Sequence, residues 1–359
     1  MSSQSGNNTT TLCGCKWRDV TYSYIQIPFG AAAWISNLLV VLTLTYHHTL
    51  RTKYFIVCAL AFADFIEGVA TFVAGVWRST SLQQGWACDC ISKWHCFVLP
   101  QSWMWRWSEI ATAYMLLAVS FDRFIAVFYP LAHMTRGILY AKRMVLAVYI
   151  CACINTVFGG LHPYLEQPKL MAAFCSSSSI FYKPYYILNK NLGSFGSFSS
   201  VLIFGVVYCK YRKIGSSRIA AIQSDKNQLA KHKSTQKRLT KTMAISNLCT
   251  LLLDSVPRAY GIFIDVYKEA NFLGSNKAII FQLTKLNAMA NFFIYAIRHD
   301  DIKMGLKALF RCESLPAASV VGNTARSLGG RSLSNRLTSR QPSIRAQPIT
   351  DRPVIATHR

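Results

Sequence analysis

The sequence predicts an all-α membrane protein, a seven-transmembrane helix bundle with a short amphipathic helix after span seven. Three observations favour this fold class. The chain is 52% hydrophobic with the apolar residues gathered in long blocks, its positive charge is concentrated in alternate connections, and an even number of cysteines lies on the opposite side from those connections. The blocks lack strand-like alternation of apolar and polar residues, which argues against an outer-membrane barrel.

Each of the seven apolar blocks is long enough to cross a bilayer. A bilayer core of about 30 Å needs roughly 20 residues in a helix. Backbone polar groups in lipid must be paired within their own segment, so a helix is the expected form of each block. Five blocks are mostly apolar: 24–46, 54–77, 143–163, 185–209 and 239–264. Two more blocks are long enough but contain charges: 96–128 and 276–297.

The net charge of +24 is segregated along the chain. The first, third and fifth connections, residues 47–53, 129–143 and 210–241, are basic, and the last holds ten Lys or Arg residues against one acid. The positive-inside rule places such connections in the cytoplasm. We therefore expect a multi-pass plasma-membrane protein with an extracellular N-terminus and a cytoplasmic C-terminus, and no binding of nucleic acid.

Cysteine usage agrees with this orientation. Six cysteines lie on the predicted outer side, an even set in an oxidising space where disulfides form: Cys13, Cys15, Cys88, Cys90, Cys96 and Cys175. Five more lie in the spans, where we expect small buried hydrophobes: Cys58, Cys151, Cys153, Cys209 and Cys249. Asn7 and Asn8 each head an Asn-x-Thr triplet, so both are candidate glycan acceptors, although such triplets also occur by chance.

The spans form one domain between two tails. We expect an extracellular tail at 1–23, a membrane domain at 24–310 and a disordered cytoplasmic tail at 311–359, which is rich in Ser, Arg and Pro. Within the domain, the apolar residues of 298–310 are spaced as in an amphipathic helix lying on the membrane surface. Cys312 follows it, and is either palmitoylated or an unmodified surface cysteine.

Five of the spans each contain a short, distinct motif. They are Asn37 in "ISNLLVV", Asp64 in "LAFADF", the run Asp122-Arg123-Phe124, Pro257 in "LLLDSVP", and Asn291 to Tyr295 in "NFFIY". Together, in this order and in these spans, they resemble the rhodopsin-like, or class A, G-protein-coupled receptors over residues 24–310. Within that family, the sequence most resembles the nematode serpentine chemoreceptors of the Srsx class. The resemblance implies a disulfide between Cys96 and Cys175.

Two positions depart from the family pattern. Phe292 stands where the family has Pro in span seven, so the usual kink there is expected to be reduced. Ser255 stands where the family usually has a Trp that responds to ligand binding.

The resemblance implies a coupling site at the inner end of span three. The Arg123 guanidinium pairs with Asp122 at rest and, when the helices part, reaches the G protein and Tyr295, with Tyr208 as a further partner. Arg suits this role because it stays charged and offers several donors in a rigid fork. Phe124 completes the motif.

The resemblance also implies a polar core in mid-membrane, formed by Asn37, Asp64 and Asn291. Burying a charge in lipid costs several kcal/mol unless it is paired or hydrated, so Asp64 indicates either a polar cavity or an inert buried acid. In the family this cluster holds water and sodium, the one metal ion that the resemblance suggests here.

The outer half of the bundle contains candidate ligand-binding residues. Arg106 and Glu109 lie three apart in span three and share a helix face, and Asp254 and Arg258 lie four apart in span six. With Tyr260 and Lys285 they line the region where the family binds ligands. The alternative is a set of internal salt bridges, with Trp103 and Trp105 facing lipid.

Two ligand classes are disfavoured. Trp105 occupies the position where amine receptors of the family have an Asp, which argues against a monoamine. Lys285 matches the retinal-binding Lys of opsins, and Glu109 would be its counter-ion, but the Trp that packs on retinal is missing. We expect no cofactor. Cations in the pocket suit a small molecule or peptide that carries a carboxylate.

The expected function is a chemosensory receptor that couples an extracellular ligand to a heterotrimeric G protein, with basic loops that also contact anionic lipids. A seven-span ligand-gated channel or transporter is the alternative from another class. No nucleophile–base pair or metal-ligand set is recognisable, so no enzyme activity is expected.

Overall fold

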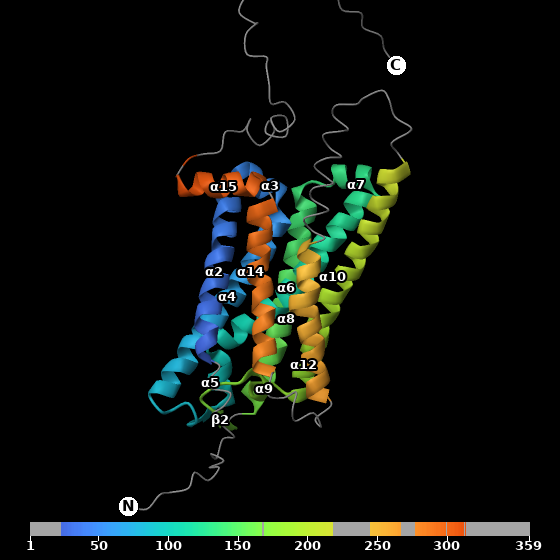
Figure 1. Ribbon diagram of the computed structural model, residues 1–359. Helices are drawn as coiled ribbons and strands as arrows, with labels where there is room; N and C mark the ends of the chain where they lie inside the picture. The colour runs from blue at the N-terminus through green and yellow to red at the C-terminus, as the bar shows by residue number, and fades with distance from the viewer. Residues whose placement is uncertain are drawn as a thin grey trace, which may run out of the picture. The chain divides into compact units, whose positions relative to one another are not determined.

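Long helices packed side by side make up the protein (Figure 1). The computed structural model describes residues 23–166, 169–217, 245–266, 277–298, 300–311 and 313. The long helices are α2 (Ser23–Tyr46), α4 (Phe55–Gln83), α6 (Pro100–Phe128), α8 (Ile138–Leu165), α10 (Lys183–Ser217), the π-helical turn η1 (Leu251–Ser255) leading into α12 (Val256–Val266), and α14 (Lys277–Arg298). They correspond in order to the seven predicted spans, so the fold class is confirmed.

Five helices in the described part of the chain are long and apolar enough to cross a membrane: α2, α4, α6, α8 and residues 183–210 of α10. Of the two blocks in which the sequence shows internal charges, 96–128 and 276–297, the first corresponds to α6, which is among these five helices, and the second to α14, which is not. Several of these charges have buried partners, which are described below with the candidate site.

Helix α6 is the central element, since it packs against α4, α8 and α10. Helix α2 packs along α4 and also contacts α14 and α15. The α2–α4 contact is close because Gly68 faces the backbone of α2. A Cβ at Gly68 would lie 2.4 Å from the backbone nitrogen of Trp34, so only glycine fits.

The third span begins later than the sequence predicted. Cys96 lies in a separate short helix, α5 (Lys93–Val98), and α6 starts at Pro100. Leu99 between them is extended, with φ −56° and ψ 134°. A residue before proline is disfavoured in the helical conformation, which explains the break. The expected outer boundary at residue 96 is therefore wrong.

A small outer substructure surrounds α5. Strands β1 (Cys90–Ser92) and β2 (Leu170–Ala172) pair antiparallel, with Ile91 opposite Met171. The short helix α9 (Ser177–Ile180) follows. A disulfide joins Cys96 to Cys175, as the family resemblance implied. Cys88 and Cys90 are disulfide-bonded too.

Three short helices lie at the opposite end of the bundle: α3 (His48–Lys53), α7 (Pro130–Thr135) and α15 (Asp300–Phe310) (Figure 1). The predicted amphipathic helix is α15. It buries Ile302 and Ala308, and Asp301 accepts hydrogen bonds from Lys53 at 2.6 Å and from Tyr54 at 3.0 Å. Phe310 remains exposed.

The free cysteines of the spans do not lie in the protein core. Cys151, Cys153 and Cys209 are exposed, and Cys58 and Cys249 are partly buried. The expectation of burial is wrong for the three exposed cysteines, because a hydrophobe in a membrane helix is equally well solvated by lipid tails. The partly buried Cys58 does pack against core residues of the bundle.

Candidate functional site

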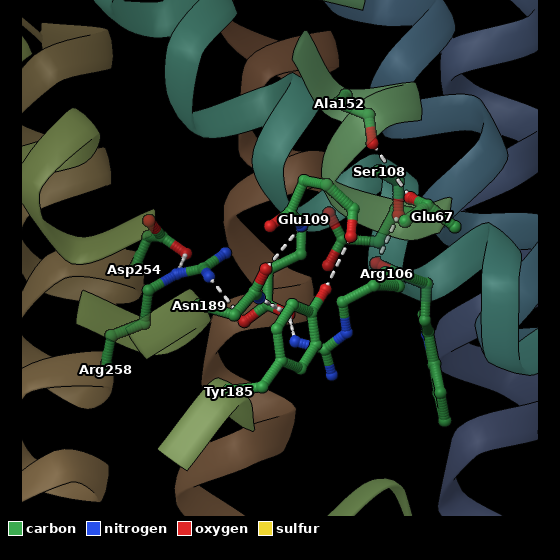
Figure 2. A network of polar contacts seen from close by, with 12 residues as sticks. Glu67, Arg106, Ser108, Glu109, Ala152, Tyr185, Asn189, Asp254 and Arg258 are labelled. Atoms are coloured by element: carbon green, nitrogen blue, oxygen red, sulfur yellow. Dashed lines mark hydrogen bonds and ion pairs between the residues drawn. The ribbon is translucent and has the colours of Figure 1, made fainter. Parts of the chain in front are cut away.

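A network of buried ion pairs joins helices of the bundle near the end of α6 that begins at Pro100 (Figure 2). Glu109 of α6 lies between two cations. One carboxylate oxygen accepts a hydrogen bond from Arg258 of α12 at 2.9 Å, and the other lies 3.0 Å from Arg106, one turn away on α6. Both pairings are needed, because a carboxylate in this environment costs several kcal/mol unless it is compensated.

Asp254 extends this network to α10. It accepts hydrogen bonds from Arg258 at 2.7 Å and from Ser197 at 2.7 Å. Asp254 belongs to η1, which ends two residues before Pro257. Proline lacks an N–H and its ring crowds the carbonyl four residues back, which accounts for the wider turn. The predicted pairs Arg106–Glu109 and Asp254–Arg258 are thus both present.

Polar side chains continue the network towards α8. Asn189 of α10 donates to Glu109 at 3.3 Å and accepts from Asn155 of α8 at 2.6 Å. The Tyr185 hydroxyl donates to the backbone carbonyl of Asn155 at 2.8 Å. Helices α6, α8, α10 and α12 therefore share one hydrogen-bonded system, with Glu109 at its centre.

A second buried pair joins Lys285 of α14 to Glu67 of α4. The Lys285 ammonium also lies 5.6 Å from the centre of the Trp105 ring, and Trp105 donates to the Thr71 hydroxyl at 3.0 Å. Trp105 is only 8% exposed, so the alternative in which it faces lipid is wrong, whereas Trp103 is 44% exposed, in agreement with that alternative. The hydrogen bond to Thr71 holds the Trp105 indole inside.

Two further cations stand near these pairs. Arg78 of α4 donates to Gln26 and to the backbone carbonyls of Phe174 and Cys175, and its guanidinium lies 5.2 Å from the Trp105 ring centre. Lys190 of α10 lies 4.5 Å from the Tyr186 ring centre and interacts electrostatically with Glu109.

The outer charge cluster is the name used below for these eight residues: Glu67, Arg78, Arg106, Glu109, Lys190, Asp254, Arg258 and Lys285. The sequence alone did not indicate a pocket position for Arg78 or Lys190, or a role for Glu67. A rule that flags every charge inside or at the edge of a span would have found all three. Tyr260, also predicted to line the pocket, is partly buried.

The mid-membrane polar core is present in part. Asp64 accepts hydrogen bonds from Asn291 and Thr112, each at 3.1 Å. Ser246 donates to Asn291 at 3.0 Å. Asn37 instead donates to the backbone carbonyl of Ala288 at 3.2 Å. The three helices α2, α4 and α14 are linked at this level as expected, with α6 and the sixth span joining them.

The inner end of α6 carries the Asp-Arg-Phe motif. A nitrogen of Arg123 lies 3.6 Å from Asp122, and His133 of α7 lies 3.2 Å from the other Asp122 oxygen. Sequence analysis missed His133, since nothing in its local pattern places it beside Asp122. Tyr295 is buried, whereas Tyr208 is 40% exposed. The Phe124 ring stacks on Phe128 with centroids 4.3 Å apart.

Outside the membrane helices, two lysines form ion pairs with Glu166. Lys93 donates to Glu166 at 2.9 Å, and Lys169 donates at 3.3 Å. The hydrogen bond from Lys93 lowers the pKa of Glu166, so this carboxylate is ionised at neutral pH. Because the folded pKa is depressed, the stabilising contribution is present above the unfolded pKa and is lost as pH falls through the folded pKa.

Several predicted sites lie outside the described residues. These are the glycan acceptors Asn7 and Asn8, the cysteines Cys13 and Cys15, the acylation candidate Cys312, and residues 218–241 of the basic connection.

Comparison with known proteins bears on the same helices. Residues 36–295 match the family described as 7 transmembrane receptor (rhodopsin family). Olfactory receptor 7A17 of Homo sapiens is 27% identical over 300 residues, covering 77% of this chain and 86% of that receptor. The substance-P receptor of Canis lupus familiaris is 24% identical over 312 residues, covering 82% and 72%.

A third relative is longer. The probable glycoprotein hormone G-protein coupled receptor of Anthopleura elegantissima is 21% identical over 294 residues, which cover 79% of this chain but only 29% of that protein. The family match, residues 36–295, contains the outer charge cluster, the mid-membrane polar core and the Asp122–Arg123 pair.

Proposed function

This chain belongs to the rhodopsin family of seven-transmembrane receptors, and we propose that it couples an extracellular ligand to a heterotrimeric G protein. As a member of this family it is a receptor in the membrane and not an enzyme. The relatives include olfactory receptors, which supports our proposal of a chemosensory function; assignment to the nematode serpentine chemoreceptors is a further proposal that rests on the sequence resemblance alone.

One observation carries this proposal. Helix α6 runs without a break from Pro100 to Phe128 and bears both charged sites, Arg106 and Glu109 near one end and Asp122 and Arg123 near the other. A change in the pairing of Glu109 at one end can therefore be transmitted through a continuous helix to Arg123 at the other. To shift the receptor between two helix arrangements, a ligand needs only a higher affinity for one of them than for the other.

We assign the inner end of α6 to G-protein coupling. The Asp122–Arg123 distance of 3.6 Å allows a weak ion pair that a small helix shift can break. His133 competes for the same carboxylate at 3.2 Å. Once separated from Asp122, the Arg123 guanidinium offers its donors to a carbonyl or carboxylate of the partner protein. Tyr295 and Tyr208 remain its proposed intramolecular partners.

We propose no organic cofactor. Lys285 is held in an ion pair with Glu67, and the Trp that packs on retinal in opsins is missing from span six. A sodium ion beside Asp64 remains a proposal that rests on the family resemblance.

The orientation is likewise proposed. The end of the bundle with α3, α7 and α15 carries the basic connections, and we place it in the cytoplasm. The end with the Cys96–Cys175 disulfide then faces the oxidising exterior.

The coupling proposal is tested with Arg123→Ala. We expect the variant to fold and reach the cell surface, because only one side chain at the cytoplasmic end is truncated. It should lose most nucleotide exchange on the G protein, because the Arg123 guanidinium that donates to the G protein is removed. The measurement is ligand-free and ligand-evoked exchange in membranes, with surface expression recorded in parallel. Arg51→Ala is the matched control, since Arg51 is an exposed cation at the same end of the bundle. Exchange by Arg123→Ala equal to that of the parent would contradict the proposal.

A further inference from the structure

We propose that two disulfides join Cys13 and Cys15 to Cys88 and Cys90, and so bind the chain before α2 covalently to the first outer loop. The first outer loop is the name used below for residues 84–92, between α4 and α5. The inference rests on the proposed orientation, in which this end of the bundle faces the oxidising exterior. It does not depend on coupling to a G protein.

Few cysteines can be the partners of Cys88 and Cys90, which are both disulfide-bonded. The disulfide between α5 and the chain after β2 uses two others, and five more are free thiols in the described part of the chain. The sequence has 12 cysteines in all. The remaining partners are therefore Cys13, Cys15 and Cys312, apart from a bond between Cys88 and Cys90 themselves.

Cys312 is too far from the first outer loop to be a partner. It stands between Arg311 and Glu313, directly after α15, and α15 lies at the opposite end of the bundle from β2 and α5 (Figure 1). Helix α6 runs between these two ends and has 29 residues, which gives a length of about 43 Å. The Cα atoms of a disulfide lie less than about 7 Å apart, so Cys312 is excluded.

A bond between Cys88 and Cys90 would conflict with the backbone around them. Cys90 is the first residue of β1 and lies opposite Ala172 of β2. The carbonyl of Asp89, between the two cysteines, accepts a hydrogen bond from the Ala173 N–H at 2.8 Å. In an extended chain, residues two apart have Cα atoms about 6.6 Å apart, at the upper limit for a disulfide. A mutual bond would therefore pull the chain out of its pairing with β2.

The cysteines before α2 lie within reach of the first outer loop, because α2 begins beside the end of α4. Arg78, near the end of α4, donates a hydrogen bond to Gln26 in the first turn of α2 at 3.1 Å. Cys15 precedes α2 by eight residues, and Cys88 follows α4 by five. Eight extended residues span up to about 26 Å, so the two segments can meet.

The two segments also match in the number and spacing of their thiols. Each has two cysteines separated by one residue, "CGC" at 13–15 and "CDC" at 88–90. In the oxidising secretory compartment, such thiols react by exchange with the disulfide of an oxidoreductase. For each bond, two thiols lose two protons and two electrons, and the oxidoreductase disulfide is reduced to two thiols. Four thiols thus give two bonds, and none of the four remains free.

These disulfides would extend the outer substructure to a third segment. The carbonyl of Ala87 in the first outer loop accepts a hydrogen bond from the Phe174 N–H at 3.0 Å. Phe174 directly precedes Cys175, which is bonded to Cys96 of α5. The chain before α2 is thereby tied, through the first outer loop, to the substructure that holds the outer end of span three.

The inference is tested by mapping the disulfides of the full-length receptor. The protein is expressed in eukaryotic cells, treated with N-ethylmaleimide to block free thiols, purified as the monomer, freed of N-linked glycans and digested with trypsin without reduction. Trypsin releases the cysteines before α2 in peptide 1–16 and those of the first outer loop in peptide 79–93, because Lys16, Arg78 and Lys93 are its cleavage sites. Mass spectrometry should find the two peptides joined and lighter than their sum by four hydrogen atoms, and should find them separate after reduction.

The Cys96–Cys175 bond is the internal control. It joins peptides 94–106 and 170–190, and its presence shows that the outer end of the bundle was oxidised. The inference is overturned if that bond is found while peptide 79–93 is alkylated, carries an internal bond or is joined to a peptide other than 1–16. Such a result would leave the proposed orientation and coupling intact. Absence of both linkages would overturn the inference and the orientation together.

Thermal stability gives a second readout. The double variants Cys13→Ala/Cys15→Ala and Cys88→Ala/Cys90→Ala should each lower the Tm by several degrees, because a covalent constraint on the unfolded chain is lost. The quadruple variant should be no less stable than either double variant, because all three lack the same two bonds. Additive losses in the quadruple variant would contradict the pairing.

A matched control is available on α8. Cys151 and Cys153 have the same spacing, but both are free and exposed. The variant Cys151→Ala/Cys153→Ala should leave the Tm unchanged, because no bond is lost. A decrease as large as in the other double variants would show that the effect does not come from disulfides.

Discussion

At the scale of single residues, charged side chains inside the bundle form ion pairs with partners on other helices. Lys285 matches a retinal-binding position in sequence, and in the disfavoured opsin interpretation Glu109 would be its counter-ion. The structure instead joins Lys285 to Glu67 of α4 and gives Glu109 to Arg106 and Arg258. The residue types were evident in the sequence, but their partners were not.

The Lys285–Glu67 pair provides a direct test of this pairing. Lys285→Met should destabilise the receptor by about 3–5 kcal/mol, because it leaves a buried carboxylate without compensation. The double variant Lys285→Met/Glu67→Gln should recover a large part of the loss, since neither charge remains. Thermal unfolding of purified protein measures both. A double variant no more stable than Lys285→Met alone would show that Glu67 is not the partner.

At the scale of elements, proline and glycine decide where helices break and how closely they pack. Pro100 separates α5 from α6, and Pro257 follows the π-helical turn that presents Asp254. Span existence and order followed from the sequence, because long apolar blocks admit only helices in lipid. The outer boundary of span three was predicted wrongly because the run from residue 96 was treated as one helix, although Pro100 disfavours a helical conformation at the residue before it.

Close packing of α2 on α4 depends on Gly68. Gly68→Ala should lower the Tm of the receptor by several degrees, because the new methyl group would lie 2.4 Å from the backbone of Trp34 and must push the helices apart. Gly205→Ala on α10 is the control, since a Cβ there meets no atom within 4 Å. That substitution should leave Tm unchanged or raise it, as alanine is favoured over glycine within a helix by about 1 kcal/mol. Equal effects of the two substitutions would exclude a role for the close α2–α4 contact.

At the scale of the whole molecule, the two ends of the bundle differ in chemistry. One end has a disulfide, a two-stranded sheet and the outer charge cluster, and the other has basic connections, α15 and the Asp122–Arg123 pair. Such a division is what a receptor requires, with recognition and coupling on opposite sides of one membrane.

The orientation predicts the accessibility of the two termini. An epitope tag at the N-terminus should be stained on intact cells, and one at the C-terminus only after permeabilisation, because the positive-inside rule places the basic connections in the cytoplasm. Immunofluorescence with and without detergent measures this. Staining of the C-terminal tag on intact cells would invert the membrane topology and remove the coupling site from the G protein.

The sequence by itself determined the number and order of the spans, the segregation of charge, the Asp122–Arg123 motif and the two short-range pairs, Arg106–Glu109 and Asp254–Arg258. Each depends on composition or on neighbours within one helical turn, where spacing alone sets contact. Only the tertiary structure decided that Glu109 meets Arg258, that Lys285 meets Glu67 and that Trp105 turns inward. These contacts join different helices, and the rotation of each helix about its axis is set by packing across the bundle.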